Sequence, residues 1–168
     1  MVIRKLPTVV TDNTLLSRLT ALEIADFLPL IFTKVLIPVE VRKEAFRSRD
    51  KRRLRNLLNQ MSDFFVYCQQ DDYLVKEFLK ESLDEGEASA IAQAEYTGSA
   101  LILDERKGHG EAVKRDLPVF RTTKILSMLK EAGFIPAIKP YLDKLNETGF
   151  YLSSRIYNSL LRKAGELE

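Results

Sequence analysis

Four acidic residues are candidates for chemistry, and two of them directly follow apolar segments, where carboxylates are unusual. Asp12 directly follows the β-branched run PTVVT, and Asp104 directly follows the apolar residues 100–103. Glu44 and Glu87 lie in segments with helical character. Mg²⁺ and Mn²⁺ prefer oxygen ligands, commonly a few carboxylates completed by water and substrate phosphate. If these four side chains gather, they could support metal-assisted hydrolysis, because a bound cation lowers the pKa of water and stabilises developing charge.

Each acid also has a simpler explanation when it is taken alone. Asp12 could only cap a helix, and Glu44 could be a solvated helix charge in a surface ion pair. Asp84, Glu85 and Glu87 could all favour the dipole of the helix that they begin, and of these only Glu87 is expected to be functional. A competing catalytic centre is harder to find, because the chain has one histidine and no glycine-rich phosphate loop.

The elements that must position these acids follow from the apolar pattern. Short apolar or β-branched runs at residues 7–11, 34–37, 64–67, 100–103 and 118–121 predict strands, with helical segments between them. This alternation predicts an α/β fold with a central parallel sheet of about four to five short strands and helices on both faces. Parallel strands end at one edge, so Asp12 and Asp104 should lie close together there. The pattern does not predict the strand order.

The length of 168 residues fits a single domain. Residues 136–147 and 153–164 have the spacing of amphipathic helices. We therefore expect one domain over residues 1–168, with a core over residues 1–134 and a C-terminal helical extension over residues 135–168.

Charge is balanced overall, at a formal net charge of +2, but it is unevenly distributed. Residues 42–55 carry eight basic side chains, and the candidates for contact with a phosphate backbone are Arg47, Arg52, Arg53 and Arg55. The alternative is a solvated helix face. No stacking platform of aromatic residues accompanies the block, so no base-specific contacts are expected.

The remaining composition indicates a cytoplasmic protein. A single cysteine excludes an internal disulfide and suits a reducing compartment. No window approaches the roughly 20 apolar residues of a membrane span, and the first residues lack the pattern of a signal peptide. No membrane partner is expected.

Several segments in order resemble the PIN-domain ribonucleases, in particular the VapC-like toxins of toxin–antitoxin pairs. The matching pieces are TDNTLLSRL at 11–19, IPVEVRKE at 37–44, LDEGEASAIAQA at 83–94 and LILDERKG at 101–108. The tail, from KEAGF at 130–134 to RKAGE at 162–166, is similar to the C-terminal part of one subgroup. The similarity covers nearly the whole chain.

This resemblance implies an endoribonuclease that uses Mg²⁺ or Mn²⁺. The family's catalytic acids fall on Asp12, Glu44, Glu87 and Asp104, of which Asp12, Glu87 and Asp104 are expected to bind the metal. The expected supporting residues are Asn13, Glu105 and Thr123. The usual partners are RNA, an antitoxin protein and a second copy of the chain.

The chain departs from the subgroup's pattern at two places. The subgroup often has two aspartates after the fourth strand and a following Ala-Arg, whereas this chain has Asp104-Glu105 and Gly108-His109. Either Asp104 or Glu105 could face the metal. His109 could stand near phosphate in place of the arginine, or it could be a loop residue, which we favour.

Two rival functions have to be weighed against a nuclease. A PIN-like fold that has lost catalysis could serve as a module that binds RNA or protein. A phosphoacceptor receiver module would need an acidic pair after the first strand, and here Asp12 is followed by Asn13 and Thr14.

Overall fold

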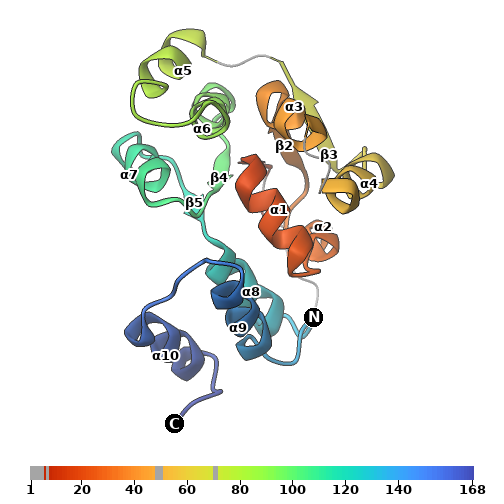
Figure 1. Ribbon diagram of the computed structural model, residues 1–168, viewed down its shortest axis with the longest axis vertical. Helices are drawn as coiled ribbons and strands as arrows, with labels where there is room; N and C mark the ends of the chain where they lie inside the picture. Colours follow the sequence, from red (N-terminus) through yellow and green to blue (C-terminus); the bar gives the residue numbers. More distant parts are fainter. Residues whose placement is uncertain (1–5, 7, 48–50, 70–71) are drawn as a thin grey trace. The chain divides into compact units, whose positions relative to one another are not determined.

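The computed structural model describes residues 6, 8–47, 51–69 and 72–168 (Figure 1). Pro7, where the first strand was expected to begin, and Arg49, in the basic block, lie outside the described residues. The elements in order are β1 (Val9–Thr11), α1 (Asn13–Ala21), η1 (Ala25–Phe27), α2 (Leu28–Ile31), β2 (Val35–Pro38), α3 (Val39–Arg47), α4 (Arg52–Gln60), β3 (Phe65–Cys68), α5 (Tyr73–Leu79), α6 (Glu85–Thr97), β4 (Ala100–Ile102), α7 (Arg106–Lys114), β5 (Val119–Phe120), α8 (Thr122–Glu131), α9 (Lys139–Glu147) and α10 (Ser154–Lys163).

The sheet has the strand order β3-β2-β1-β4-β5, and every pairing is parallel. The chain moves in opposite directions across the sheet from β1 to β2 and from β4 to β5. Right-handed crossovers therefore place the helices of these two connections on opposite faces. The predicted α/β fold with a parallel sheet flanked by helices is confirmed. The short strand after Pro118 is at the edge, where a residue without an amide hydrogen is tolerated.

Helix α6 packs against the sheet and against several helices. It contacts β1, β2 and β4, and it also contacts α3, α5 and α7. Its residues from Gly86 to Ala94 are all buried, and most have small side chains. Small side chains on every side let neighbouring elements approach closely, so a helix without a polar face is stable here. Leu79, Ile91 and Leu101 belong to the same apolar cluster.

Local signals set the boundaries of the helices that enclose the sheet edge. The Asp12 side chain accepts a hydrogen bond from the Leu15 amide at 2.9 Å and so begins α1. Asp84 does the same for α6 through the Glu87 amide at 2.8 Å. Helix α6 ends at Gly98, whose φ of 63° is the left-handed conformation that glycine adopts without strain.

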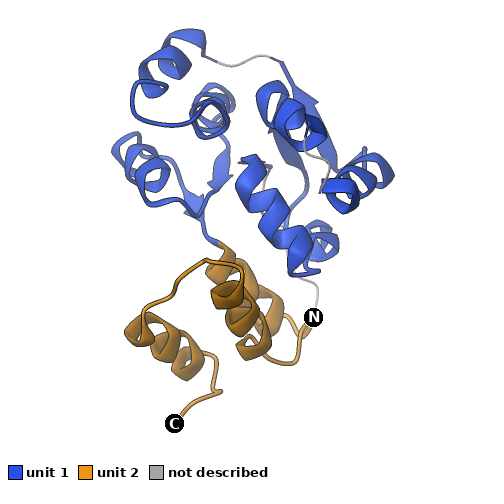
Figure 2. Cartoon of the chain, viewed as in Figure 1, with its two compact units in different colours: residues 1–121 blue, residues 122–168 orange. Residues whose placement is uncertain are grey.

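The chain divides into two compact units, residues 1–121 and residues 122–168 (Figure 2). The first contains the whole sheet, and the second contains α8, α9 and α10. Within the second unit, the Glu166 carboxylate accepts hydrogen bonds from Lys130 Nζ at 2.6 Å and from the Ile138 amide at 2.7 Å. The organisation expected from the sequence, a core over residues 1–134 and an extension over residues 135–168, remains a prediction.

Among the helices of the described residues, none is both long enough and apolar enough to span a bilayer.

Candidate active site

Two of the predicted acids follow neighbouring strands at the carboxyl edge of the sheet. Thr11, the last residue of β1, pairs with Ile102, the last residue of β4, and its hydroxyl donates to the Ile102 carbonyl oxygen at 3.3 Å. Asp12 follows directly on one strand, and Asp104 comes two residues after the other. Both aspartates are buried, at 3% and 6% exposed.

Asp12 is the most perturbed carboxyl of this edge. Its pKa is raised from 3.8 to about 7, chiefly because burial penalises the charged form. The Leu15 amide lowers the pKa, whereas the negative charges of Glu87, Asp84 and Asp104 raise it. The three acids are therefore near enough to act on Asp12 electrostatically. An added cation would relieve both their mutual repulsion and the cost of burial.

Glu87 points into the same buried region from the first turn of α6. It is 6% exposed, and its Oε1 is buried without a hydrogen-bond partner among the described residues. Burial, followed by the charge of Asp84, raises its pKa. Helix α7 comes close because residue 108 is a glycine: a Cβ there would lie 3.0 Å from Glu87 Oε1 and 2.8 Å from Leu103 Cδ2.

Glu44 reaches the N-terminus of α6 from helix α3. A Cβ on Gly86 would lie 3.2 Å from both Glu44 carboxylate oxygens. The pKa of Glu44 is raised first by partial burial and then by the Asp84 charge, while hydrogen bonding with the Asn13 side chain lowers it. The Oδ1 atom of Asn13 is buried and has no hydrogen-bond partner within the described part of the chain. Glu44, which is half-buried, thus forms the more exposed side of an acidic group made of Asp12, Glu44, Asp84, Glu87 and Asp104, and the buried Asn13 lies beside it.

Arg18 contacts two acids of this candidate site, and the sequence reasoning did not predict it. From helix α1 its Nη1 atom donates to Asp104 Oδ2 at 2.5 Å, and its Nη2 atom lies 3.7 Å from Glu105 Oε1. The Asp104 side chain is 1% exposed and that of Glu105 is 51% exposed. Asp104 is therefore the residue that faces the buried group, and Glu105 lies at its rim. Asp84 was also missed, because the sequence explained it as a helix-dipole charge alone.

The other predicted residues lie elsewhere. His109 lies within α7, so the interpretation as a loop residue was wrong; burial and the nearby Arg121 charge lower its pKa. Thr123 is half-buried on α8 in the second unit. Arg47 ends α3, and Arg52, Arg53 and Arg55 lie on α4, where the first two are exposed and the third is half-buried.

The donor set suits a hard divalent cation. Carboxylate oxygens are the ligands that Mg²⁺ and Mn²⁺ prefer, and Glu87 Oε1 is a buried acceptor without a partner in the described chain. Within the ranges that the structure describes, no three acidic, histidine or cysteine side chains are already gathered to hold an ion. Magnesium commonly binds one or two carboxylates and keeps several waters, so such a cluster is not required.

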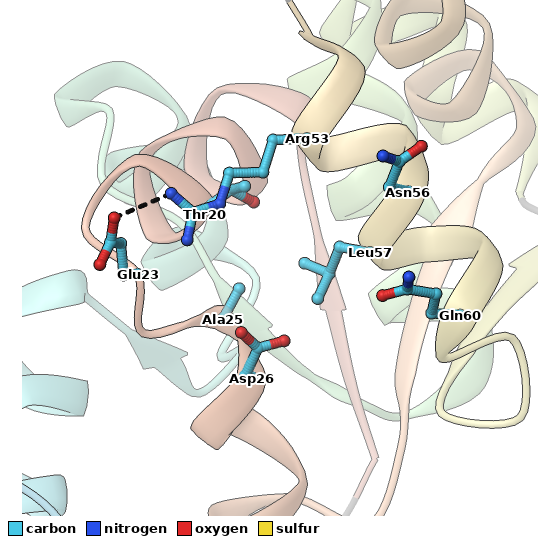
Figure 3. Close-up of a pocket in the computed structure, with 8 residues that line it drawn as sticks. All are labelled: Thr20, Glu23, Ala25, Asp26, Arg53, Asn56, Leu57 and Gln60. Carbon is cyan, nitrogen blue, oxygen red and sulfur yellow. Dashed lines mark hydrogen bonds and ion pairs between the residues drawn. The ribbon is translucent and has the colours of Figure 1, made fainter.

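A separate pocket of about 250 Å³ lies at the other end of α1 (Figure 3). Thr20 and Glu23 line one side and Arg53, Asn56 and Gln60 the other, and Arg53 Nη1 pairs with Glu23 Oε1 at 2.9 Å. Helix α1 has nine residues and is about 13 Å long. The pocket is therefore distinct from the acidic group around Asp12.

A family model described as PIN domain matches residues 8–166, nearly the whole chain. No curated protein matches the chain.

Proposed function

The chain belongs to the PIN-domain family, which is a nuclease fold in general, and from this membership we propose that it is a metal-dependent endoribonuclease. The observation that carries the proposal is the buried acidic group around Asp12. Burial and three neighbouring acids raise the pKa of Asp12 to about 7. Such an arrangement is unfavourable in isolation and is stabilised by a bound cation.

Asp12, Glu87 and Asp104 are the residues that would hold Mg²⁺ or Mn²⁺. When bound, the ion would supply an activated water and stabilise negative charge on a phosphate. Glu44 is placed to accept a proton, because its pKa is raised and its carboxylate is half-exposed beside Asn13. Glu105 at the rim and Thr123 on α8 are proposed to support substrate binding.

The arginines of α3 and α4 are proposed to bind the RNA backbone. Arg47 and Arg52 are exposed, and Arg55 is half-buried on the same basic helix as Arg53. Contacts of this kind bind phosphate regardless of sequence and weaken as salt is added.

We further propose that the protein is the cytoplasmic toxin of a type II toxin–antitoxin pair and that it forms a homodimer. The support is the ordered resemblance of its segments to the VapC-like branch, together with exposed apolar side chains. Leu74 and Phe78 are 78% and 60% exposed on α5, and Ile156 is 51% exposed on α10. Leu74 and Phe78 are four residues apart on one helix, and adjacent exposed apolar side chains of this kind are candidates for an interface with a protein partner.

The direct test is cleavage of a labelled RNA by the purified protein in Mg²⁺ or Mn²⁺ and in EDTA. Asp12→Asn should abolish cleavage while keeping the helix cap, because asparagine caps as well as aspartate does. Asp72→Asn is the matched control, since Asp72 caps α5 through the Val75 amide at 3.1 Å. Salt-dependent RNA binding without cleavage in any metal would instead support the catalytically inactive binding module.

A further inference from the structure

A buried positive charge already contacts one of the carboxylates that are proposed to hold the metal. The guanidinium of Arg18 donates to Asp104 at 2.5 Å, and the two side chains are 14% and 1% exposed. A charged pair with so little exposure is only weakly screened by salt. Asp104 is therefore held by a cation of the protein itself.

The remaining metal-facing atoms are engaged differently. Glu87 Oε1 has no hydrogen-bond partner within the described chain. Asp12 Oδ1 accepts a backbone hydrogen bond, from the Leu15 amide at 2.9 Å. The acidic group thus has one part, at Asp12 Oδ1 and Glu87 Oε1, that is held by a backbone amide or by no hydrogen bond in the described chain, and one part, at Asp104, that is paired with Arg18.

We infer that Arg18 is a built-in competitor of the divalent cation: it holds Asp104 in the metal-free protein and must release it before Asp104 can complete the metal site. An ion bound to Asp104 Oδ2 would lie within a few ångströms of the guanidinium, where two positive charges repel each other strongly. The inference rests on the proposed metal site and deepens it.

Two properties follow from this competition. The metal affinity is lower than three carboxylates alone would give, so the site fills only above a threshold of divalent cation. Arg18 is a positioning residue that acts through Asp104.

The test is the Mn²⁺ affinity of the intact protein, measured from the free-ion signal in electron paramagnetic resonance. Arg18→Gln should bind Mn²⁺ at least about tenfold more tightly than wild type. The matched control is Arg115→Gln, which also removes one positive charge and a close ion pair: Arg115 contacts Glu95 at 2.6 Å near the C-terminal end of α6. The control should leave the affinity unchanged.

The same pair of variants in an Asp104→Asn background tests the route of the effect. Without the Asp104 carboxylate, Arg18→Gln should no longer change Mn²⁺ affinity. An equal tightening in that background would show a general charge effect and would overturn the inference, as would unchanged or weaker affinity in Arg18→Gln itself.

If Arg18→Gln does not fold by circular dichroism, Arg18→Lys takes its place. Lysine keeps the charge but loses the planar fork that matches a carboxylate. A tightening of about threefold is then expected, and unchanged or weaker affinity again contradicts the competition. Mn²⁺ binding that Asp12→Asn fails to weaken in every background would instead overturn the proposed metal site, and this inference with it.

Discussion

Replacing Asp12 by asparagine should stabilise the metal-free protein at neutral and alkaline pH. The pKa of Asp12 is about 7 in the folded chain, against an ordinary value of 3.8. An acid whose pKa rises on folding binds its proton more tightly in the folded state. Its contribution to stability is therefore complete below about pH 4 and is lost as pH rises through about 7.

The size of this effect follows from the shift. Three pKa units correspond to about 4 kcal/mol at most, using about 1.36 kcal/mol per unit. The asparagine side chain would keep the hydrogen bond from the Leu15 amide and would never ionise. At about 2–4 °C per kcal/mol for a protein of this size, Asp12→Asn should raise the Tm at pH 8 by on the order of 10 °C.

The assay is urea and thermal denaturation in EDTA at pH 4, 6 and 8, with Asp72→Asn as the control cap. The control should stay within about 0.5 kcal/mol of wild type at every pH. At pH 4 the Asp12→Asn advantage should vanish, because Asp12 is then protonated when folded. The reasoning is refuted if Asp12→Asn is no more stable than wild type at pH 8, or if it gains as much at pH 4.

Three further outcomes are expected. Gly108→Ala should lower the free energy of unfolding by about 1–3 kcal/mol and reduce cleavage, because its Cβ would press on Leu103 and Glu87. A Cβ at Gly110 on the same helix meets nothing within 4 Å, so Gly110→Ala should be neutral or stabilising by up to about 1 kcal/mol, and denaturation curves that do not separate the two variants would contradict this packing. Neutralising Arg52, Arg53 and Arg55 together should weaken RNA binding and reduce the slope of log K against log salt by about 0.7 for each lost phosphate contact, as measured by fluorescence anisotropy. An unchanged slope would show that these arginines only form a solvated helix face. Glu166→Ala should lower the stability of the second unit by about 1–3 kcal/mol, because it leaves Lys130 and the Ile138 amide without the carboxylate that they contact. The measurement is hydrogen exchange of α8 and α9, and unaltered protection would show that Glu166 does not stabilise this unit.

The fold was predictable because its signals are local. The β-branched run before Asp12 and the apolar run before Asp104 became adjacent parallel strands. The strand order was not predictable, because it depends on which apolar surfaces pack together. Helix α6 illustrates the same limit, since its small buried residues show a helix in the sequence but not which strands it covers.

The candidate site was partly predictable for a related reason. The carboxyl edge of a parallel sheet brings Asp12 and Asp104 together in any strand order that makes their strands neighbours. The pairing of Arg18 with Asp104 joins residues 86 positions apart and depends on the reach of a long side chain, so no local pattern reveals it. The choice between Asp104 and Glu105 likewise depends on burial, which only the folded chain displays.

The central claim is that the acidic group around Asp12 holds a divalent cation that is required to cut RNA. Its most direct test is single-turnover cleavage of a labelled RNA across a Mn²⁺ titration, with wild type and Asp12→Asn compared at equal folded concentration. We expect cleavage by wild type to rise with Mn²⁺ occupancy and to be absent in EDTA and in Asp12→Asn. Equal cleavage by both proteins, or cleavage that persists in EDTA, would contradict the account.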